Sequence, residues 1–232
     1  MITEIQWTEI NNDNLTNLES VLKLYDQSFP IDVRESHDVF RKGLKYATSS
    51  FPNSFRFLAG MEGDTVASFA TGHYLADVNT GFIVYIVTNP LVRGNGLGST
   101  TLLKMEELLK KDAISAGHSA LRFSILETEM EELVHTEAEK ENCIKRERFY
   151  EKNNYRSYES INYLQPPLHG DTNGIPLNLL FKSFQGSQTI TQTEISRIVQ
   201  AMYREKYYEV NRIDKAVLSK CLNKMGIDHT SF

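Results

Sequence analysis

The chain has 232 residues, of which 41% are hydrophobic, and a formal net charge of −5. This length can bury one good core and a small appendage. The charge gives no footprint for nucleic acid, and no run approaches the ~18 apolar residues of a membrane span. Cys143 and Cys221 have no metal or redox spacing, so no metal is expected. Residues 1–7 lack the pattern of a signal peptide, and we expect a cytoplasmic protein without a membrane partner.

The N-terminal part predicts one strand, two amphipathic helices and three further strands. A short strand over about 3 to 8 precedes a helix whose apolar residues recur from Leu15 to Phe29 and which ends before Pro30. Ser36 can cap a second helix that reaches Ala47. Strands are then expected near 55 to 60, 65 to 75 and 81 to 88, and residues 62–64 form a hairpin turn between the first two.

Three alternating glycines follow the last of these strands and lead into an amphipathic helix. Gly94, Gly96 and Gly98 let the backbone turn tightly with its N–H groups pointing inward. The helix that starts near Leu97 adds its free amides and the positive end of its dipole. The arrangement is an anion cradle, and a phosphate or pyrophosphate is its natural occupant.

The C-terminal half predicts three strands and four helices in all, counting the helix that follows the glycines. That helix ends at Gly117, and residues 120 to 126 indicate a buried strand. A helix to Asn153 and strands around 155 to 164 and 176 to 184 follow. A capping-box pattern at residues 191–194 begins one short helix, and another can start at Asn211 and stop at Gly226. Apolar helix faces are usually core, which favours a structural brace over a role in substrate binding.

Two common nucleotide motifs do not fit the glycine loop. A P-loop requires a lysine where Ser99 stands, and the dinucleotide fingerprint requires a different glycine spacing, which disfavours a GTP- or NAD-binding protein. The string Arg-Gly-Asn-Gly-Leu-Gly at 93–98 resembles the pyrophosphate-binding motif of the GNAT (Gcn5-related N-acetyltransferase) family. Residues 148–156 resemble a later motif of the family, Phe-Tyr-Glu-Lys-x-Gly-Phe, with Asn154 at the glycine position. Asparagine is the next best residue for that left-handed turn.

The resemblance extends to the order of the expected elements. It implies an α/β (α+β) fold of the GNAT-like acyl-CoA N-acyltransferase type, with a mixed, mostly antiparallel sheet flanked by helices. It also implies a GNAT N-acetyltransferase domain over residues 1–185 and leaves 186–232 as a C-terminal helical extension. Dimers are common in the family, and these C-terminal helices could supply the surface of a homodimer.

The resemblance further implies acetyl-CoA as co-substrate and direct transfer of the acetyl group to a primary amine of a small molecule or peptide. The strand before the loop would offer backbone hydrogen bonds to the pantetheine and the acetyl carbonyl at Ile86, Val87 and Thr88. The pyrophosphate would be held by Arg93, Gly94, Asn95, Gly96, Leu97, Gly98 and Ser99. Tyr150 matches the tyrosine that donates a proton to the leaving thiolate in many members, a role that suits a phenol.

The general base is left open, because residues 81–88 carry no carboxylate. Glu127, at the end of the next strand, is the first candidate, since these strand ends face the expected cleft. It could equally be one solvated glutamate among many. His73 and, through water, Tyr85 are further candidates, although a lone histidine on a strand is usually structural.

Seven glutamates lie between Glu127 and Glu141, ahead of a basic run. This pattern is typical of a solvated helix face. Alternatively, it forms a negative lip that attracts a cationic amine such as a polyamine, an aminoglycoside or a lysine side chain.

Two functions therefore remain. One is an acetyl-CoA-dependent N-acetyltransferase, and the other is a catalytically silent GNAT-fold module that binds CoA or another acyl-CoA as a sensor or scaffold. Retention of both the phosphate loop and Tyr150 favours the enzyme.

Overall fold

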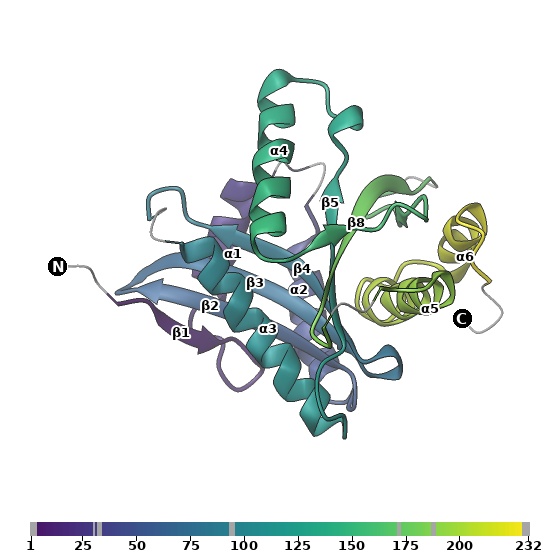
Figure 1. Ribbon diagram of the computed structural model, residues 1–232. Helices are drawn as coiled ribbons and strands as arrows, with labels where there is room; N and C mark the ends of the chain where they lie inside the picture. Colours follow the sequence, from purple (N-terminus) through teal and green to yellow (C-terminus); the bar gives the residue numbers. More distant parts are fainter. Residues whose placement is uncertain are drawn as a thin grey trace. The chain divides into compact units, whose positions relative to one another are not determined.

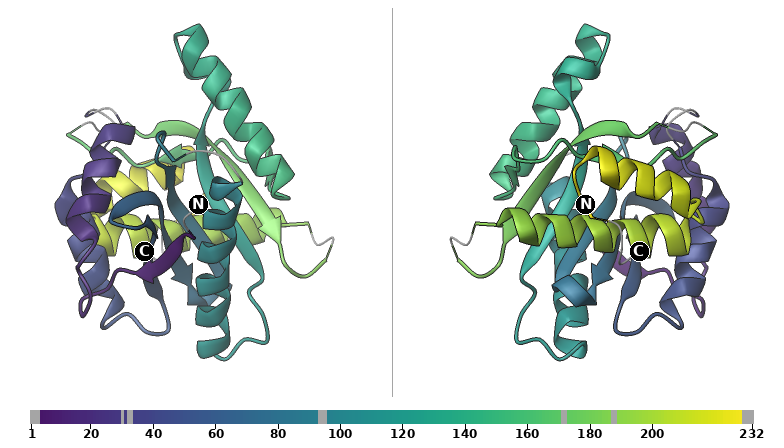
Figure 2. Two further views of the ribbon diagram at one scale, coloured as in Figure 1. Left: turned by 90° about the vertical axis from the view of Figure 1, so that its left-hand side faces the viewer. Right: turned by 90° about the vertical axis from the view of Figure 1, so that its right-hand side faces the viewer.

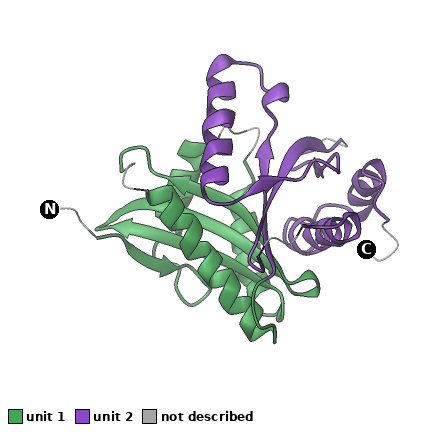
Figure 3. Cartoon of the chain, viewed as in Figure 1, with its two compact units in different colours: residues 1–121 green, residues 122–232 purple. Residues whose placement is uncertain are grey.

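The computed structural model describes residues 4–29, 31, 34–92, 96–170, 173–186 and 189–228. The chain divides into two compact units, residues 1–121 and 122–232 (Figure 3). The expected fold class is confirmed: the structure is a mostly antiparallel sheet with helices, and helices are present at the C-terminal end.

Four antiparallel strands form the sheet of the first unit. Their order is β1 (Gln6–Glu9), β2 (Ser54–Glu62), β3 (Thr65–Leu75) and β4 (Thr80–Thr88). A hairpin joins β2 and β3 through Gly63 and Asp64, and Gly63 takes the positive φ of 57° that such a turn needs. A short 3-10 turn, Ala76–Val78, links β3 and β4.

Helices cover both faces of this sheet. Figures 1 and 2 show α1 (Leu18–Ser28) and α2 (His37–Ala47) on one face and α3 (Leu97–Ser115) on the other. The expected first helix included Leu15, which instead lies outside α1 and is exposed. Ser36 does occupy the position before α2, but its side chain makes no capping hydrogen bond.

A hydrophobic core of the first unit lies between the sheet and helices α1 and α2. Leu22 and Tyr25 of α1 and Phe40 of α2 pack with the strand residues Phe57 and Phe69, all at most 2% exposed. Burying a side chain of this size stabilises the fold by roughly 1.5–3 kcal/mol. The predicted apolar spacing in both helices therefore corresponds to the faces that cover the sheet.

A β-bulge in β4 changes the direction of its side chains. Thr71 pairs with Tyr85 and Gly72 with Ile83, so Val84 is the extra residue on β4. Strand side chains alternate between faces, and the extra residue reverses that alternation. Tyr85 consequently packs on the α1/α2 side, with its ring 5.1 Å from that of Tyr25.

The sheet of the second unit centres on β8 (Ile175–Ser183). It pairs antiparallel with β5 (Phe123–Glu129), with β6 (Arg156–Ser157) and with β7 (Leu164–Gln165). The expectation of one strand over 155 to 164 was wrong, because the segment forms only these two short strands. A 3-10 turn, Glu131–Leu133, precedes α4 (Glu137–Lys152).

The described part of the C-terminal segment contains three helical elements. They are α5 (Gln192–Met202), the π-helix η4 (Tyr203–Val210) and α6 (Lys215–Lys224). The predicted capping box of α5 is confirmed. A helix start at Asn211 was wrong: Arg212 takes a φ of 62°, and the Asp214 carboxylate caps α6 by accepting from the Ala216 amide at 2.7 Å. None of the helices in the described ranges is long and apolar enough to cross a membrane.

Candidate active site

The N-terminus of α3 has the backbone geometry of an anion cradle. Gly96, directly before α3, has a φ of 75°, a left-handed conformation that side chains disfavour. Apart from its chain neighbours, no described residue comes within 4 Å of a Cβ built on Gly96, so the described residues leave the space beside this turn open. Leu97, Gly98 and Ser99 form the first turn of α3, where amides have no acceptor within the helix. The described part of the loop fits a pyrophosphate.

The other residues expected in this loop, Arg93, Gly94 and Asn95, lie outside the described residues. The segments on either side are well anchored. The Asn89 amide and side chain donate to the carbonyls of Ala67 and Val66, at 2.8 and 2.9 Å. On the helix side, the Thr101 hydroxyl donates to that of Ser68 at 2.9 Å. Both ends of the loop are therefore fixed to β3.

The three residues expected to bind pantetheine, Ile86, Val87 and Thr88, are the last three residues of β4. Val87 is buried in the core beneath α1 and α2. Ile86 pairs with Ala70 and Thr88 with Ser68, and by alternation both belong to the opposite, α3 side of the sheet. Because Ile86 and Thr88 are only partly buried, that side of β4 keeps accessible surface next to α3.

Glu127 lies within β5, two residues before its end, and is held by a cluster of polar side chains. The Tyr163 hydroxyl donates to Glu127 Oε1, and Gln165 Nε2 donates to Oε2 at 3.0 Å. The Tyr207 hydroxyl lies 2.8 Å from Oε1 and 2.9 Å from Oε2. Three side chains of the protein therefore hold the Glu127 carboxylate in place, unlike that of a solvated glutamate, which hydrogen-bonds only to water.

Burial dominates the protonation of this cluster. Desolvation raises the pKa of Glu127 above its ordinary value, although the hydrogen bonds from Tyr163, Tyr207 and Gln165 and the charge of Lys206 act in the opposite direction. Burial and the Glu127 charge raise the pKa of Tyr163 well above its usual value. The tyrosine therefore stays protonated and donates, while the carboxylate is more basic than an exposed one.

Sequence reasoning missed the three donors. Tyr203 and Tyr207 stand four residues apart, which places both on one face of a helix, and that spacing was a usable signal. Tyr163 and Gln165 gave no comparable signal, because they belong to an irregular segment around β7.

Tyr150 lies near the end of α4 and is 9% exposed. Its ring packs against those of Phe149 and Tyr155, with centroids 5.0 and 5.8 Å away. Burial raises the pKa of Tyr150 to about 12. Asn154, next after the helix cap, has the predicted left-handed φ, at 67°. The hydroxyl thus remains a proton donor at neutral pH, as its expected role requires.

The two other candidate bases lie in the first unit. His73 is fully buried against the rings of Phe55 and Tyr46, which supports a structural role. Tyr85 contacts Tyr25 through hydroxyls 3.2 Å apart, and the Glu35 amide donates to Tyr25 at 2.7 Å.

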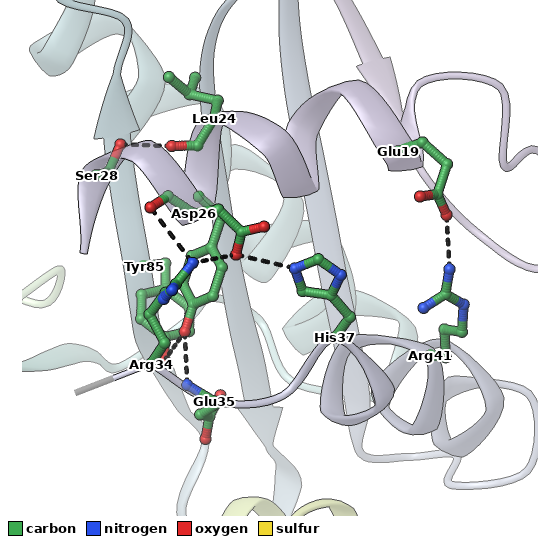
Figure 4. Close-up of polar contacts among 10 residues, drawn as sticks. Glu19, Leu24, Asp26, Ser28, Arg34, Glu35, His37, Arg41 and Tyr85 are labelled. Atoms are coloured by element: carbon green, nitrogen blue, oxygen red, sulfur yellow. Dashed lines mark hydrogen bonds and ion pairs between the residues drawn. The ribbon is translucent and has the colours of Figure 1, made fainter. Parts of the chain in front are cut away.

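Beside these tyrosines, Asp26 accepts from Arg34 at 2.6 Å and lies 3.0 Å from His37 Nε2 (Figure 4). The hydrogen bond with His37 is the main cause that lowers the pKa of Asp26. These contacts tie the end of α1 to the start of α2, so this side of the first unit is held by both aromatic and polar contacts.

Some glutamates of the acidic segment form exposed ion pairs, and two glutamates of the segment, Glu129 and Glu131, line a cavity. Glu141 pairs with Lys145 at 3.0 Å and Glu129 with Arg146 at 2.8 Å, and such exposed pairs contribute about 0–1 kcal/mol each. A cavity of about 300 Å³ lies in the second unit. Its charged lining consists of Glu129, Glu131, Arg146, Glu147, Glu151, Arg156 and Glu159, in which carboxylates outnumber guanidinium groups.

Several solved structures share this fold. A putative GNAT acetyltransferase from Bacteroides thetaiotaomicron matches with a TM-score of 0.63 and 19% identity, over 86% of this chain and 96% of that one. The PaiA N-acetyltransferase from Thermoplasma acidophilum, in complex with coenzyme A, matches at 0.50 and 16%, over 78% and 99%. An aminoglycoside 6'-N-acetyltransferase complexed with coenzyme A matches at 0.53 and 14%, over 79% and 99%. No curated protein sequence matches the chain.

The chain therefore has the fold of these GNAT acetyltransferase structures. Residues 18–123 match the model of the acetyltransferase (GNAT) family.

Proposed function

We propose that this protein is an acetyl-CoA-dependent N-acetyltransferase that transfers the acetyl group directly to a primary amine of a small molecule or peptide. The observation that carries the proposal is the Glu127 carboxylate, which is held by hydrogen bonds and has a raised pKa. The match of residues 18–123 to the GNAT family model also supports it. A base of this kind is suited to removing a proton from an amine as it attacks. Residues 1–185 would form the acetyltransferase domain and 186–232 its extension.

In this proposal the residues of the chain divide the work between binding and proton transfer. The residues from Arg93 to Ser99 hold the pyrophosphate, and the backbone of Ile86, Val87 and Thr88 holds the pantetheine and acetyl carbonyl. Glu127 accepts the proton that the amine loses as its nitrogen bonds to the acetyl carbon. Tyr150 donates a proton to sulfur as the carbon–sulfur bond breaks, so that the products are an amide and a free thiol. Exchange with water then restores both side chains.

The acidic lining of the second-unit cavity favours a cationic acceptor. Glu129 and Glu131 belong both to this lining and to the acidic segment. A negative field raises the local concentration of a polyamine, an aminoglycoside or a lysine-bearing peptide. The aminoglycoside 6'-N-acetyltransferase among the structural matches is consistent with this class of acceptor.

The direct test is release of free thiol from acetyl-CoA in the presence of a panel of these amines. We expect amine-dependent turnover that Glu127→Gln lowers at least tenfold. Glu141→Gln is the matched control, because it removes an exposed carboxylate of the same unit that pairs only with Lys145 in the described contacts. Binding of CoA with no turnover on any amine would instead support the alternative, a silent CoA-binding sensor or scaffold.

A further inference from the structure

The C-terminal segment contributes a side chain that contacts the Glu127 carboxylate. We propose that Tyr207, in the π-helix η4, is a positioning residue for Glu127, so that the segment beyond residue 186 completes the acetyl-transfer site. This inference rests on the proposed function, in which Glu127 is the base.

The contact of Tyr207 with Glu127 is two-sided. Its hydroxyl lies 2.8 and 2.9 Å from the two carboxylate oxygens, whereas Tyr163 reaches only Oε1 and Gln165 only Oε2. A hydroxyl that faces both oxygens restricts rotation of the carboxylate plane. Gln165 Nε2 also lies 3.4 Å from the Tyr207 hydroxyl, so the donor itself is held in place.

The π-helix positions Tyr207 firmly. Tyr207 is 1% exposed and Tyr203 is fully buried, and their ring centroids lie 5.6 Å apart. The Tyr203 hydroxyl donates to the Leu164 carbonyl, next to Gln165 in the chain. The two tyrosines therefore join η4 to the segment that supplies the other donors. π-helical turns are rare and are found frequently at functional sites.

Among the described residues of the second unit, the titratable groups that interact with Glu127 include the phenols of Tyr163, Tyr203 and Tyr207 and the ammonium of Lys206. Lys206 is buried and donates to Asn211 Oδ1 at 2.8 Å. Tyr207 is a neutral phenol, so Tyr207→Phe removes a hydrogen bond to Glu127 without removing a charge. The sequence analysis favoured a structural brace for the C-terminal helices. Apolar packing alone does not require the contact of the Tyr207 hydroxyl with both oxygens of Glu127.

The experiment compares Tyr207→Phe with Tyr203→Phe in the full-length chain. Each variant removes one buried hydroxyl from the same π-helix, but only Tyr207 touches Glu127. The Glu127 carboxyl is followed by NMR titration of protein with ¹³C-labelled glutamate, assigned with Glu127→Gln. The pH profile of kcat/KM with acetyl-CoA and the best amine is measured in parallel.

We expect Tyr207→Phe to move the Glu127 midpoint, and the acid limb of the profile, to higher pH. The reason is that the lost hydrogen bond favours the ionised carboxylate. We also expect kcat to fall about tenfold or more at pH values where Glu127 is ionised, with KM for acetyl-CoA little changed. Within the described contacts, Tyr203→Phe removes no hydrogen bond to Glu127, so its midpoint should move much less than that of Tyr207→Phe. An unchanged midpoint in folded Tyr207→Phe would overturn the inference.

A measurement that keeps Tyr207 in place covers the case in which Tyr207→Phe does not fold. With tyrosines labelled at Cζ, the Tyr207 signal should respond to pH at the Glu127 midpoint and lose that response in Glu127→Gln. A Tyr207 signal that ignores Glu127 would overturn the inference. Both NMR readouts are independent of turnover, so absence of acetyl transfer would contradict the proposed function alone.

Discussion

Substitution of Gly96 by valine tests whether the turn before α3 binds the pyrophosphate. At a φ of 75°, a residue with a side chain costs about 1–2 kcal/mol, and a β-branched one is especially unfavourable. Apart from Gly96 and its chain neighbours, no atom of the described residues lies within 4 Å of the added Cβ, so we expect the cost to folding to come from the backbone conformation. For a chain of this size, that cost lowers Tm by roughly 2–8 °C.

The effect on binding should be separate and larger, because the valine side chain would occupy the open space in which a phosphate approaches the amides. We expect acetyl-CoA affinity to fall at least tenfold, about 1.4 kcal/mol. Gly117→Val is the matched control. Gly117 stands beyond the other end of α3, has a φ of 91° and also has nothing within 4 Å of a built Cβ. It should lose similar stability and keep its affinity.

Calorimetric titration with acetyl-CoA and thermal unfolding on the three proteins decide between the effects. Micromolar binding that Gly96→Val abolishes and Gly117→Val retains would support the cradle. Equal losses of affinity in both variants would mean that strain in α3, rather than blocked approach, is responsible. Wild-type affinity in folded Gly96→Val would refute the reasoning, and an intact protein that does not bind would remove the basis for the enzyme proposal.

Three further predictions follow from single features. Tyr150→Phe should lower kcat and leave calorimetric CoA affinity nearly intact, because a buried phenol with a pKa of about 12 is a proton donor; if turnover is unaffected, the acid role is wrong. Simultaneous substitution of Glu129, Glu131 and Glu132 by glutamine should raise KM for a cationic acceptor at low salt, because it weakens the negative field of the proposed lip. An unchanged KM would contradict the proposal that this segment attracts the acceptor. Thr191→Ala should cost α5 about 1 kcal/mol of cap energy, seen as a Tm lower by roughly 2–4 °C, whereas an unchanged Tm would show that the cap is not stabilising.

Local patterns predicted most elements of the fold. The apolar spacing of α1 and α2, the hairpin at Gly63 and the capping box at Thr191 each depend on nearby residues, and each was confirmed. The left-handed turn at Asn154 was predicted for the same reason, and the helix end expected at Gly117 coincides with a φ of 91° at that residue. Boundaries were less accurate where tertiary contacts decide them, as in β5, which extends beyond Leu126 to Glu129.

The environment of Glu127 could not be predicted from local sequence. Its donors come from residues 36, 38 and 80 positions further along the chain, and no periodicity links such distant residues. The sequence could name Glu127 as a carboxylate after a buried run, but whether it was solvated or held depended on the fold around β7 and η4. The expected phosphate loop and Tyr150 came from motif resemblance, and their roles stay predictions.

The bulge at Val84 divides β4 into two segments of opposite phase. Before the bulge, Gly81 packs so closely against α3 that a Cβ at this position would lie 2.6 Å from Leu109. After it, the same odd-numbered positions face the other layer. The phase change uncouples the two ends of one strand, so substitutions in residues 85–88 could retune what the strand end recognises without disturbing the tight helix contact at its start.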